Sequence, residues 1–191
     1  MMQWALGDEL PISAVASGGR QKRKDPKFGN VYDHFSVVYE YGDGKKSFFS
    51  CRQQNDTAPS YAVELVGDKG RCIVDCRTGA HTIVGEKPWS YADDTKFTNE
   101  NAYKENSSRS MYQQEHDELF AGIRNNKPKH DGDWMFKSNL VALAGRMAGY
   151  SGQKVTLDDA LASNVVLFPE NVSWDMKYSL PISTPGVDTK I

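Results

Sequence analysis

The sequence lacks the features that mark several classes of protein. No run approaches the roughly 18 consecutive apolar residues of a membrane-spanning helix, and no charged start precedes an apolar stretch of the secretory kind. The net charge is −2, and the densest basic run, residues 20–24, is diluted by Asp25. Because nucleic-acid binding needs a basic surplus, we expect no nucleic-acid partner and no membrane contact. The cellular compartment stays open.

Cysteine is also scarce, with Cys51, Cys72 and Cys76 as the three examples. Cys72 and Cys76 lie four positions apart on a predicted strand, which separates them by roughly 13 Å, too far for a disulfide bond. His81 and His130 have no partners at ligand spacing, and without a two-histidine motif or paired cysteines a zinc site is unsupported. We therefore expect small buried thiols and no bound metal.

The chain does have the composition of a globular domain. Its 191 residues are 39% apolar and 25% charged, enough to bury a core. Runs rich in β-forming residues fill the first half and helical patterns fill the second, an order typical of α+β folds. We predict one α+β domain over residues 1–191, with an open, mostly antiparallel sheet of five or six strands and helices packed on one face.

A β-hairpin is the clearest local prediction. Two β-rich runs, residues 33–41 and 45–53, meet at Asp43-Gly44, a strong signal for a two-residue turn. That turn would place Tyr39 opposite Phe48 on one face of the sheet. Since apolar side chains fall on both faces, we expect helices on one face and a second subunit on the other.

Helical patterns follow after residue 109. Ser110 and Gln113 form a capping-box pattern for one helix, and a second is predicted over residues 133–150, with several small residues suited to close packing. Thr156 and Asp159 cap a short third helix. The proline-containing tail, residues 167–191, is predicted to be an extended wrapping segment.

Seven short stretches, in order along nearly the whole chain, carry a resemblance to a known family. They are residues 4–8 (WALGD), 18–21 (GGRQ), 25–35 (DPKFGNVYDHF), 64–70 (ELVGDKG), 112–117 (YQQEHD), 123–128 (IRNNKP) and 145–148 (GRMA). Together they resemble the C-terminal domain of the glucose-fructose oxidoreductase / inositol dehydrogenase / rhizopine-catabolism (Gfo/Idh/MocA) family.

The resemblance implies an oxidoreductase that transfers a hydride between nicotinamide and a sugar or cyclitol. In that family an N-terminal Rossmann domain binds NAD(P) and supplies a Lys of a Glu-Lys-Pro motif, and the catalytic His lies just before the stretch matching residues 4–8. We therefore expect both to be missing here, because Met1 is three residues before Trp4 and no G-x-G-x-x-G motif occurs. This chain should bind no cofactor itself and contain no catalytic residue. Glu86-Lys87-Pro88 follows the last predicted strand, so we interpret it as coincidence.

One set of candidate substrate-binding residues surrounds the polar loop after Gly18-Gly19. It consists of Arg20, Gln21, Arg23, Tyr32 and His34. Arg and Gln can hydrogen-bond to sugar hydroxyls, and Tyr offers a flat face; by resemblance the loop lies toward the substrate cleft. The alternative is a surface loop whose arginines pair with Asp25 or Asp33. Because neighbours on a strand point to opposite faces, Asp33 and His34 are not expected to pair.

The second set is Tyr112, Gln113 and His116, near the start of the first long helix. One interpretation makes His116 a core histidine that donates to a backbone carbonyl, and the other points all three residues into the substrate cleft. Three functions stay open, in this order: a sugar oxidoreductase domain that is inactive alone, a non-enzymatic oligomerising or carbohydrate-binding module, and a hydrolase. The hydrolase would pair His34 or His116 with Asp33 or Asp117, but neither a nucleophile nor a metal can be named for it.

Overall fold

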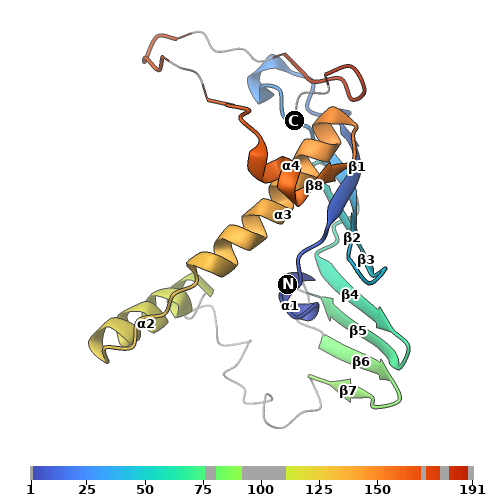
Figure 1. Cartoon of the computed structure of the whole chain (residues 1–191), viewed down its shortest axis with the longest axis vertical. Helices are drawn as coiled ribbons and strands as arrows, with labels where there is room; N and C mark the ends of the chain where they lie inside the picture. Colours follow the sequence, from blue (N-terminus) through green and yellow to red (C-terminus); the bar gives the residue numbers. More distant parts are fainter. Residues whose placement is uncertain (1, 76–80, 92–110, 169–170, 177–180, 189–191) are drawn as a thin grey trace. The chain divides into compact units, whose positions relative to one another are not determined.

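The structure is a computed structural model that describes residues 2–75, 81–91, 111–168, 171–176 and 181–188 (Figure 1). The chain divides into two compact units. Unit 1 contains Met1–Ala5 and Ala58–Asp131, and unit 2 contains Leu6–Thr57 and Gly132–Ile191. Antiparallel strands precede the long helices along the chain, which confirms the predicted α+β class.

Unit 2 is built on an antiparallel sheet with the strand order β3-β2-β1-β8. The strands are β1 (Ser13–Gly19), β2 (His34–Glu40), β3 (Lys46–Arg52) and β8 (Val155–Thr156). Helix α3 (Gly132–Ser151) lies along one face of this sheet, and α4 (Leu157–Ala162) follows β8 (Figure 1). Thr156 and Asp159 form the predicted capping box of α4, with hydrogen bonds of 3.0 and 2.9 Å.

Small residues of α3 allow its close contact with the sheet. A Cβ atom at Gly145 would overlap the Tyr39 hydroxyl, and one at Gly149 would overlap the Phe35 ring. The sheet contributes the large side chains to this interface, so the helix must contribute small ones. The buried residues of α3 are Leu140, Val141, Ala144, Gly145, Ala148, Gly149 and Ser151.

The β2–β3 hairpin differs from the prediction by one residue. Tyr39 lies opposite Ser47, not Phe48. The Tyr41 N–H donates to the Lys45 carbonyl, 3.0 Å away, and Gly44 has a φ of +83°, so the loop has three residues and its glycine occupies the left-handed position. A shift of one residue moves side chains to the opposite face: Phe48 therefore shares a face with Val38.

Unit 1 contains a second antiparallel sheet, with the order β4-β5-β6-β7. Its elements are α1 (Met2–Ala5), β4 (Ala62–Gly67), β5 (Gly70–Asp75), β6 (His81–Gly85), β7 (Trp89–Ser90) and α2 (Met111–Arg124). Within the described residues, the strands that were expected to form one meander thus belong to two sheets of four strands each. Glu86-Lys87-Pro88 lies between β6 and β7, and Ser110 lies outside the described residues.

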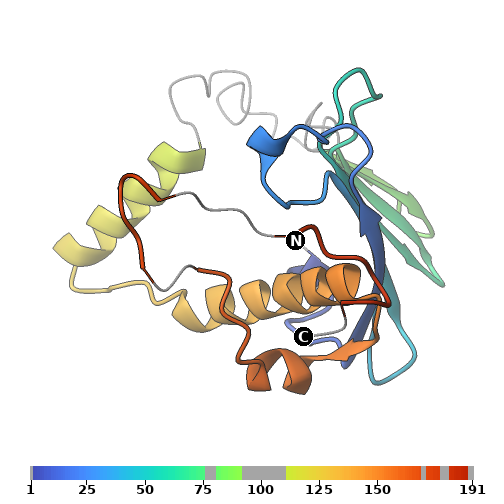
Figure 2. The same ribbon diagram turned by 90° about the horizontal axis from the view of Figure 1, so that it is seen from above.

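The end of the tail packs on unit 2, as the wrapping prediction requires. The Gly186 N–H donates to the Ser151 carbonyl at the end of α3, 2.8 Å away, and this part of the tail runs beside α3 in Figure 2. The Tyr32 hydroxyl donates to the Ser183 carbonyl at 2.7 Å. The tail therefore connects the loop before β2 to the end of α3.

No helix in the described ranges is long and apolar enough to cross a membrane. Cys51 and Cys72 are free thiols; Cys51 is exposed and Cys72 half-buried, while Cys76 lies outside the described residues. The expectation of a buried thiol is wrong for Cys51, because β3 is the edge strand of its sheet.

Candidate functional site

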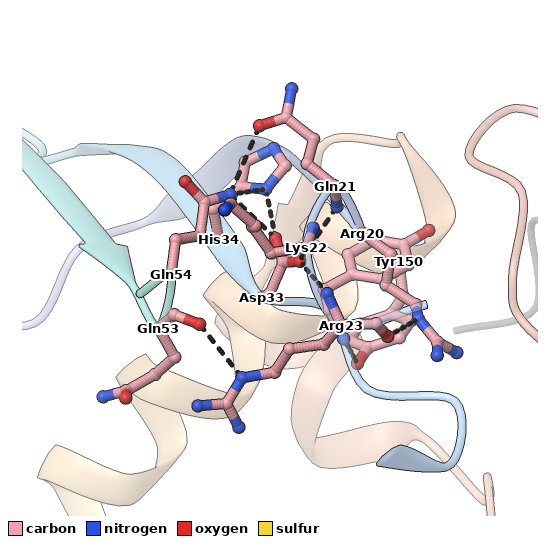
Figure 3. A network of polar contacts seen from close by, with 10 residues as sticks. Arg20, Gln21, Lys22, Arg23, Asp33, His34, Gln53, Gln54 and Tyr150 are labelled. Carbon is pink, nitrogen blue, oxygen red and sulfur yellow. Dashed lines mark hydrogen bonds and ion pairs between the residues drawn. The ribbon is translucent and has the colours of Figure 1, made fainter. Parts of the chain in front are cut away.

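The buried carboxylate of Asp33 is the centre of a polar network in unit 2 (Figure 3). Its side chain is 0% exposed. One oxygen, Oδ2, accepts hydrogen bonds from the backbone N–H groups of Gln21, Lys22 and Arg23 at 2.9, 2.7 and 2.9 Å. Three donors on one oxygen hold the loop of residues 21–23 in a fixed path, as a buried charge requires.

The second oxygen of Asp33 binds two side chains. Oδ1 lies 2.9 Å from His34 Nδ1 and 3.0 Å from Gln54 Nε2. Burial alone would raise the pKa of Asp33, but the hydrogen bonds from His34, Gln54 and the backbone of the loop lower it well below its usual value. The carboxylate therefore stays charged at neutral pH.

The contact between Asp33 and His34 corrects the sequence-based expectation that they cannot pair. Asp33 lies at a bend immediately before β2, which begins at His34. The alternation of side chains applies along an extended strand, so it does not separate these two neighbours.

Gln54 is a member of the network that the sequence analysis missed. Its Nε2 also donates to Gln21 Oε1, 3.2 Å away, so this amide joins the loop to Asp33 (Figure 3). The two-residue turn placed Gln53 beside His34, whereas the structure pairs His34 with Arg52. The three-residue loop places Gln53 opposite Asp33, where its N–H donates to the Asp33 carbonyl at 2.7 Å, and Gln54 is the next residue along the chain.

Both arginines of the first candidate set brace the loop through main-chain carbonyls. Arg20 donates to the carbonyls of Arg23 at 2.7 Å and Asp25 at 3.3 Å, and to that of Gly29. Arg23 Nε donates to the Gln53 carbonyl at 3.0 Å. The sequence analysis considered ion pairs of these arginines with the carboxylates of Asp25 or Asp33. In the structure they donate to backbone carbonyls instead.

Tyr32 is part of the packing below the loop. It is 9% exposed, and its ring stacks on Tyr150 with the centroids 4.2 Å apart. The Arg146 guanidinium lies over the Tyr150 ring, 4.4 Å from its centroid. Burial, and then the neighbouring Tyr150 and Asp188, raise the pKa of Tyr32, so its hydroxyl stays neutral.

The second candidate set belongs to unit 1, whereas the Asp33 network is formed by residues of unit 2. Tyr112, Gln113 and His116 are exposed on α2. His116 Nδ1 lies 2.7 Å from the Tyr112 carbonyl, and Gln113 donates to Asp117 at 2.9 Å. His116 therefore bonds to a backbone carbonyl as expected, but it is not a core residue.

The chemistry that the Asp33 network offers is hydrogen bonding and the holding of a proton on an imidazole. In the described part of the chain, no three His, Cys, Asp or Glu side chains gather as a possible metal site. The network itself consists of a carboxylate, an imidazole, two amides, the two arginines and backbone groups, which suits the recognition of a hydroxylated ligand.

No protein-family model matches the sequence, and no curated protein matches it either. Solved structures share its fold. A protein from Thermotoga maritima described as a "putative oxidoreductase" aligns with 81% of this chain and 43% of its own, with a TM-score of 0.53 and 15% identity. An oxidoreductase from Agrobacterium radiobacter, solved with NAD+, L-tartaric acid and magnesium, aligns with 82% of this chain and 45% of its own, with a TM-score of 0.57 and 11% identity. The chain thus spans less than half the length of either protein.

Proposed function

We propose that this chain is the substrate-side domain of an NAD(P)-dependent oxidoreductase of the Gfo/Idh/MocA type, acting on a sugar or cyclitol. The observation that carries the proposal is the alignment of four-fifths of the chain with less than half of two oxidoreductase structures. The seven stretches that resemble the family support the same assignment. NAD(P) would be bound outside this chain, which is inactive by itself.

The polar network supports a hydroxylated substrate. The Agrobacterium structure contains L-tartaric acid as well as NAD+, and that acid carries two neighbouring hydroxyl groups. In this chain Gln21 and His34 stand together at the exposed side of the Asp33 network (Figure 3). We propose these two residues, with Arg20 and Arg23 bracing the loop, as the substrate-binding part of unit 2.

We also propose that the face of the unit 2 sheet opposite α3 forms a homo-oligomer contact. Val15, Val38 and Phe48 lie in one row across three strands on the face opposite α3. Phe48 is 78% exposed and Val15 is 46% exposed. An apolar row of this kind on an otherwise polar face favours a protein contact.

A non-enzymatic carbohydrate-binding module is the second candidate. The observation that favours it is the make-up of the Asp33 network, whose groups can bind hydroxyls by hydrogen bonds alone. A binding module would need only those groups. It would use the same residues as the oxidoreductase. The two proposed functions therefore differ in whether the protein also contains a domain that binds NAD(P).

The test is a titration of the 191-residue chain with NADH and NADPH, followed by calorimetry and tryptophan fluorescence. We expect no saturable binding at millimolar cofactor; binding at micromolar cofactor would contradict the proposal. Genomic sequence upstream of the reading frame separates the two functions. An oxidoreductase requires a further domain of roughly 100–200 residues with a glycine-rich phosphate-binding turn, and a stop codon directly upstream would favour the binding module.

A further inference from the structure

The protonation of His34 follows from what Asp33 can accept. An ionised carboxylate has no proton to donate, so the 2.9 Å contact between Asp33 Oδ1 and His34 Nδ1 requires a hydrogen on Nδ1. In the neutral imidazole the other ring nitrogen, Nε2, is then an acceptor with a free lone pair. Asp33 thus fixes one tautomer of His34, in the way that a carboxylate orients a metal-binding or catalytic histidine.

The orientation of the Gln21 side-chain amide follows in the same way from its hydrogen-bond donors and acceptors. The two hydrogens of Gln54 Nε2 go to Asp33 Oδ1 at 3.0 Å and to Gln21 Oε1 at 3.2 Å. The longer 3.4 Å contact of this nitrogen with His34 Nδ1 then brings two donors together and is not a hydrogen bond, because Nδ1 carries the hydrogen given to Asp33. Because the oxygen of the Gln21 amide is used by Gln54, its NH₂ group must turn the other way. Figure 3 shows this nitrogen pointing away from the network. The loop therefore presents a donor that belongs to the same network as the imidazole, joined to it through Gln54 and Asp33.

The side chains of His34 and Gln21 both reach solvent. The His34 side chain is 32% exposed and Gln21 is exposed, whereas Asp33 is buried and Gln54 is half-buried. The buried members of the network orient the accessible ones. A hydroxyl group both donates and accepts, so an acceptor next to a donor suits a ligand with one hydroxyl or two neighbouring ones.

We infer that His34 Nε2 accepts a hydrogen bond from a hydroxyl of a sugar or cyclitol ligand, and that the Gln21 amide donates to the same or the adjacent hydroxyl. The inference deepens the proposed function and rests on it for the ligand class. In this arrangement His34 and Gln21 touch the ligand, and Asp33 and Gln54 are positioning residues.

A purely structural role for His34 would need only the bond to Asp33. The loop is already held by three backbone N–H groups on Asp33 Oδ2, and these bonds do not involve His34. Two substitutions separate the roles. His34→Asn keeps a donor near the position of Nδ1 and loses the acceptor at Nε2, whereas His34→Gln keeps an acceptor near the position of Nε2 and loses the donor to Asp33.

The first measurement is a long-range ¹H–¹⁵N spectrum of the full chain labelled in histidine, under mildly alkaline conditions in which histidine is neutral. The His34 signals are assigned from their loss in the variants. We expect a protonated Nδ1 and an unprotonated Nε2 in the unsubstituted protein. The opposite tautomer would overturn the inference before any ligand is added.

The second measurement is a titration with myo-inositol and with D-glucose as probes. We expect at least one to shift the His34 Nε2 signal in a saturable way. His34→Asn should weaken that binding on the order of tenfold, the effect of one good hydrogen bond, and His34→Gln should change it much less. Absence of a saturable shift with both probes, or unchanged binding by His34→Asn, would overturn the inference.

These results are separate from the test of the proposed function. Binding of NADH by the chain would contradict the proposal that NAD(P) is bound outside it. It would not change the conclusion drawn from the His34 titration. An unresponsive His34 in a chain that also binds no cofactor would remove the inference alone.

Discussion

Gly145 of α3 lies directly against the hydroxyl of Tyr39 on β2, with no room for a Cβ atom between them. Tyr39 is 4% exposed, and its hydroxyl donates to the Val141 carbonyl one turn earlier on the helix, at 3.1 Å. This contact sets the distance between the helix and the sheet of unit 2, and the loop that contains the candidate site connects two strands of that sheet.

Gly145→Ala should therefore destabilise the protein. Alanine favours a helix over glycine by about 1 kcal/mol, but forcing a methyl group into a filled interface costs about 1–3 kcal/mol. We expect a net fall in the free energy of unfolding, measured by urea denaturation. Gly42→Ala is the control, because a Cβ at Gly42 meets no atom within 4 Å; equal effects of the two substitutions would contradict the packing argument.

Asp33→Asn should remove a pH-dependent part of the stability. Since the pKa of Asp33 is lowered in the folded state, the unfolded chain takes up the proton first as the pH falls. The stabilisation by Asp33 is therefore complete above the ordinary aspartate pKa of about 3.9, and it is lost as the pH falls toward the lowered value.

At neutral pH we expect Asp33→Asn to reduce the free energy of unfolding by about 1–3 kcal/mol, and the difference from the unsubstituted protein should shrink in acid. Denaturant unfolding at a series of pH values measures this difference. Asp175→Asn, at an exposed position in the tail, should change little at any pH. A difference for Asp33→Asn that does not vary between neutral and acidic pH would exclude the charged network.

The α+β class could be predicted because hydrophobic patterns and turn residues act locally. The capping box at Thr156 and Asp159 shows how well such signals work where the interacting groups are three residues apart. The hairpin shows their limit. Asp43-Gly44 is compatible with a two-residue or a three-residue loop, and the sequence pattern does not show that Phe35, Val37 and Tyr39 pack together against α3, as the observed register requires.

The candidate site could be predicted in its location but not in its roles. Tyr32 was expected to offer a free ring, yet it is covered by Tyr150, which lies 118 positions away in the sequence. Asp33 binds backbone groups of residues 21–23, whose path no side-chain pattern reveals. Residue types indicated a polar site, and long-range packing decided which members face solvent.

Tyr39 also makes the stability sensitive to alkaline pH. Burial, with smaller effects from Tyr41 and Cys51, raises the pKa of Tyr39 to about 12, whereas an unfolded tyrosine ionises near pH 10. The stabilisation is complete below about pH 10 and is lost as the pH rises through the folded value. Tyr39→Phe should lower the free energy of unfolding by about 1 kcal/mol at neutral pH and weaken its decline between about pH 10 and 12.

The measurement for Tyr39 is a set of unfolding curves at neutral and alkaline pH. Tyr61→Phe serves as the control, since Tyr61 is 63% exposed and should leave the alkaline profile unchanged. An alkaline decline of the same size in Tyr39→Phe as in the unsubstituted chain would show that another group causes it.

The row of Val15, Val38 and Phe48 predicts the assembly state. If this face contacts a second copy, the chain should be dimeric or larger at micromolar concentration, and Phe48→Glu should shift it toward the monomer because a buried unpaired charge destabilises an interface. Sedimentation velocity measures the shift. Val66→Glu is the control, because Val66 is 80% exposed but lies on the other sheet. A monomeric unsubstituted chain, or an equal shift by both variants, would argue against the sheet-face contact and leave the Asp33 network as the remaining candidate for a binding surface in unit 2.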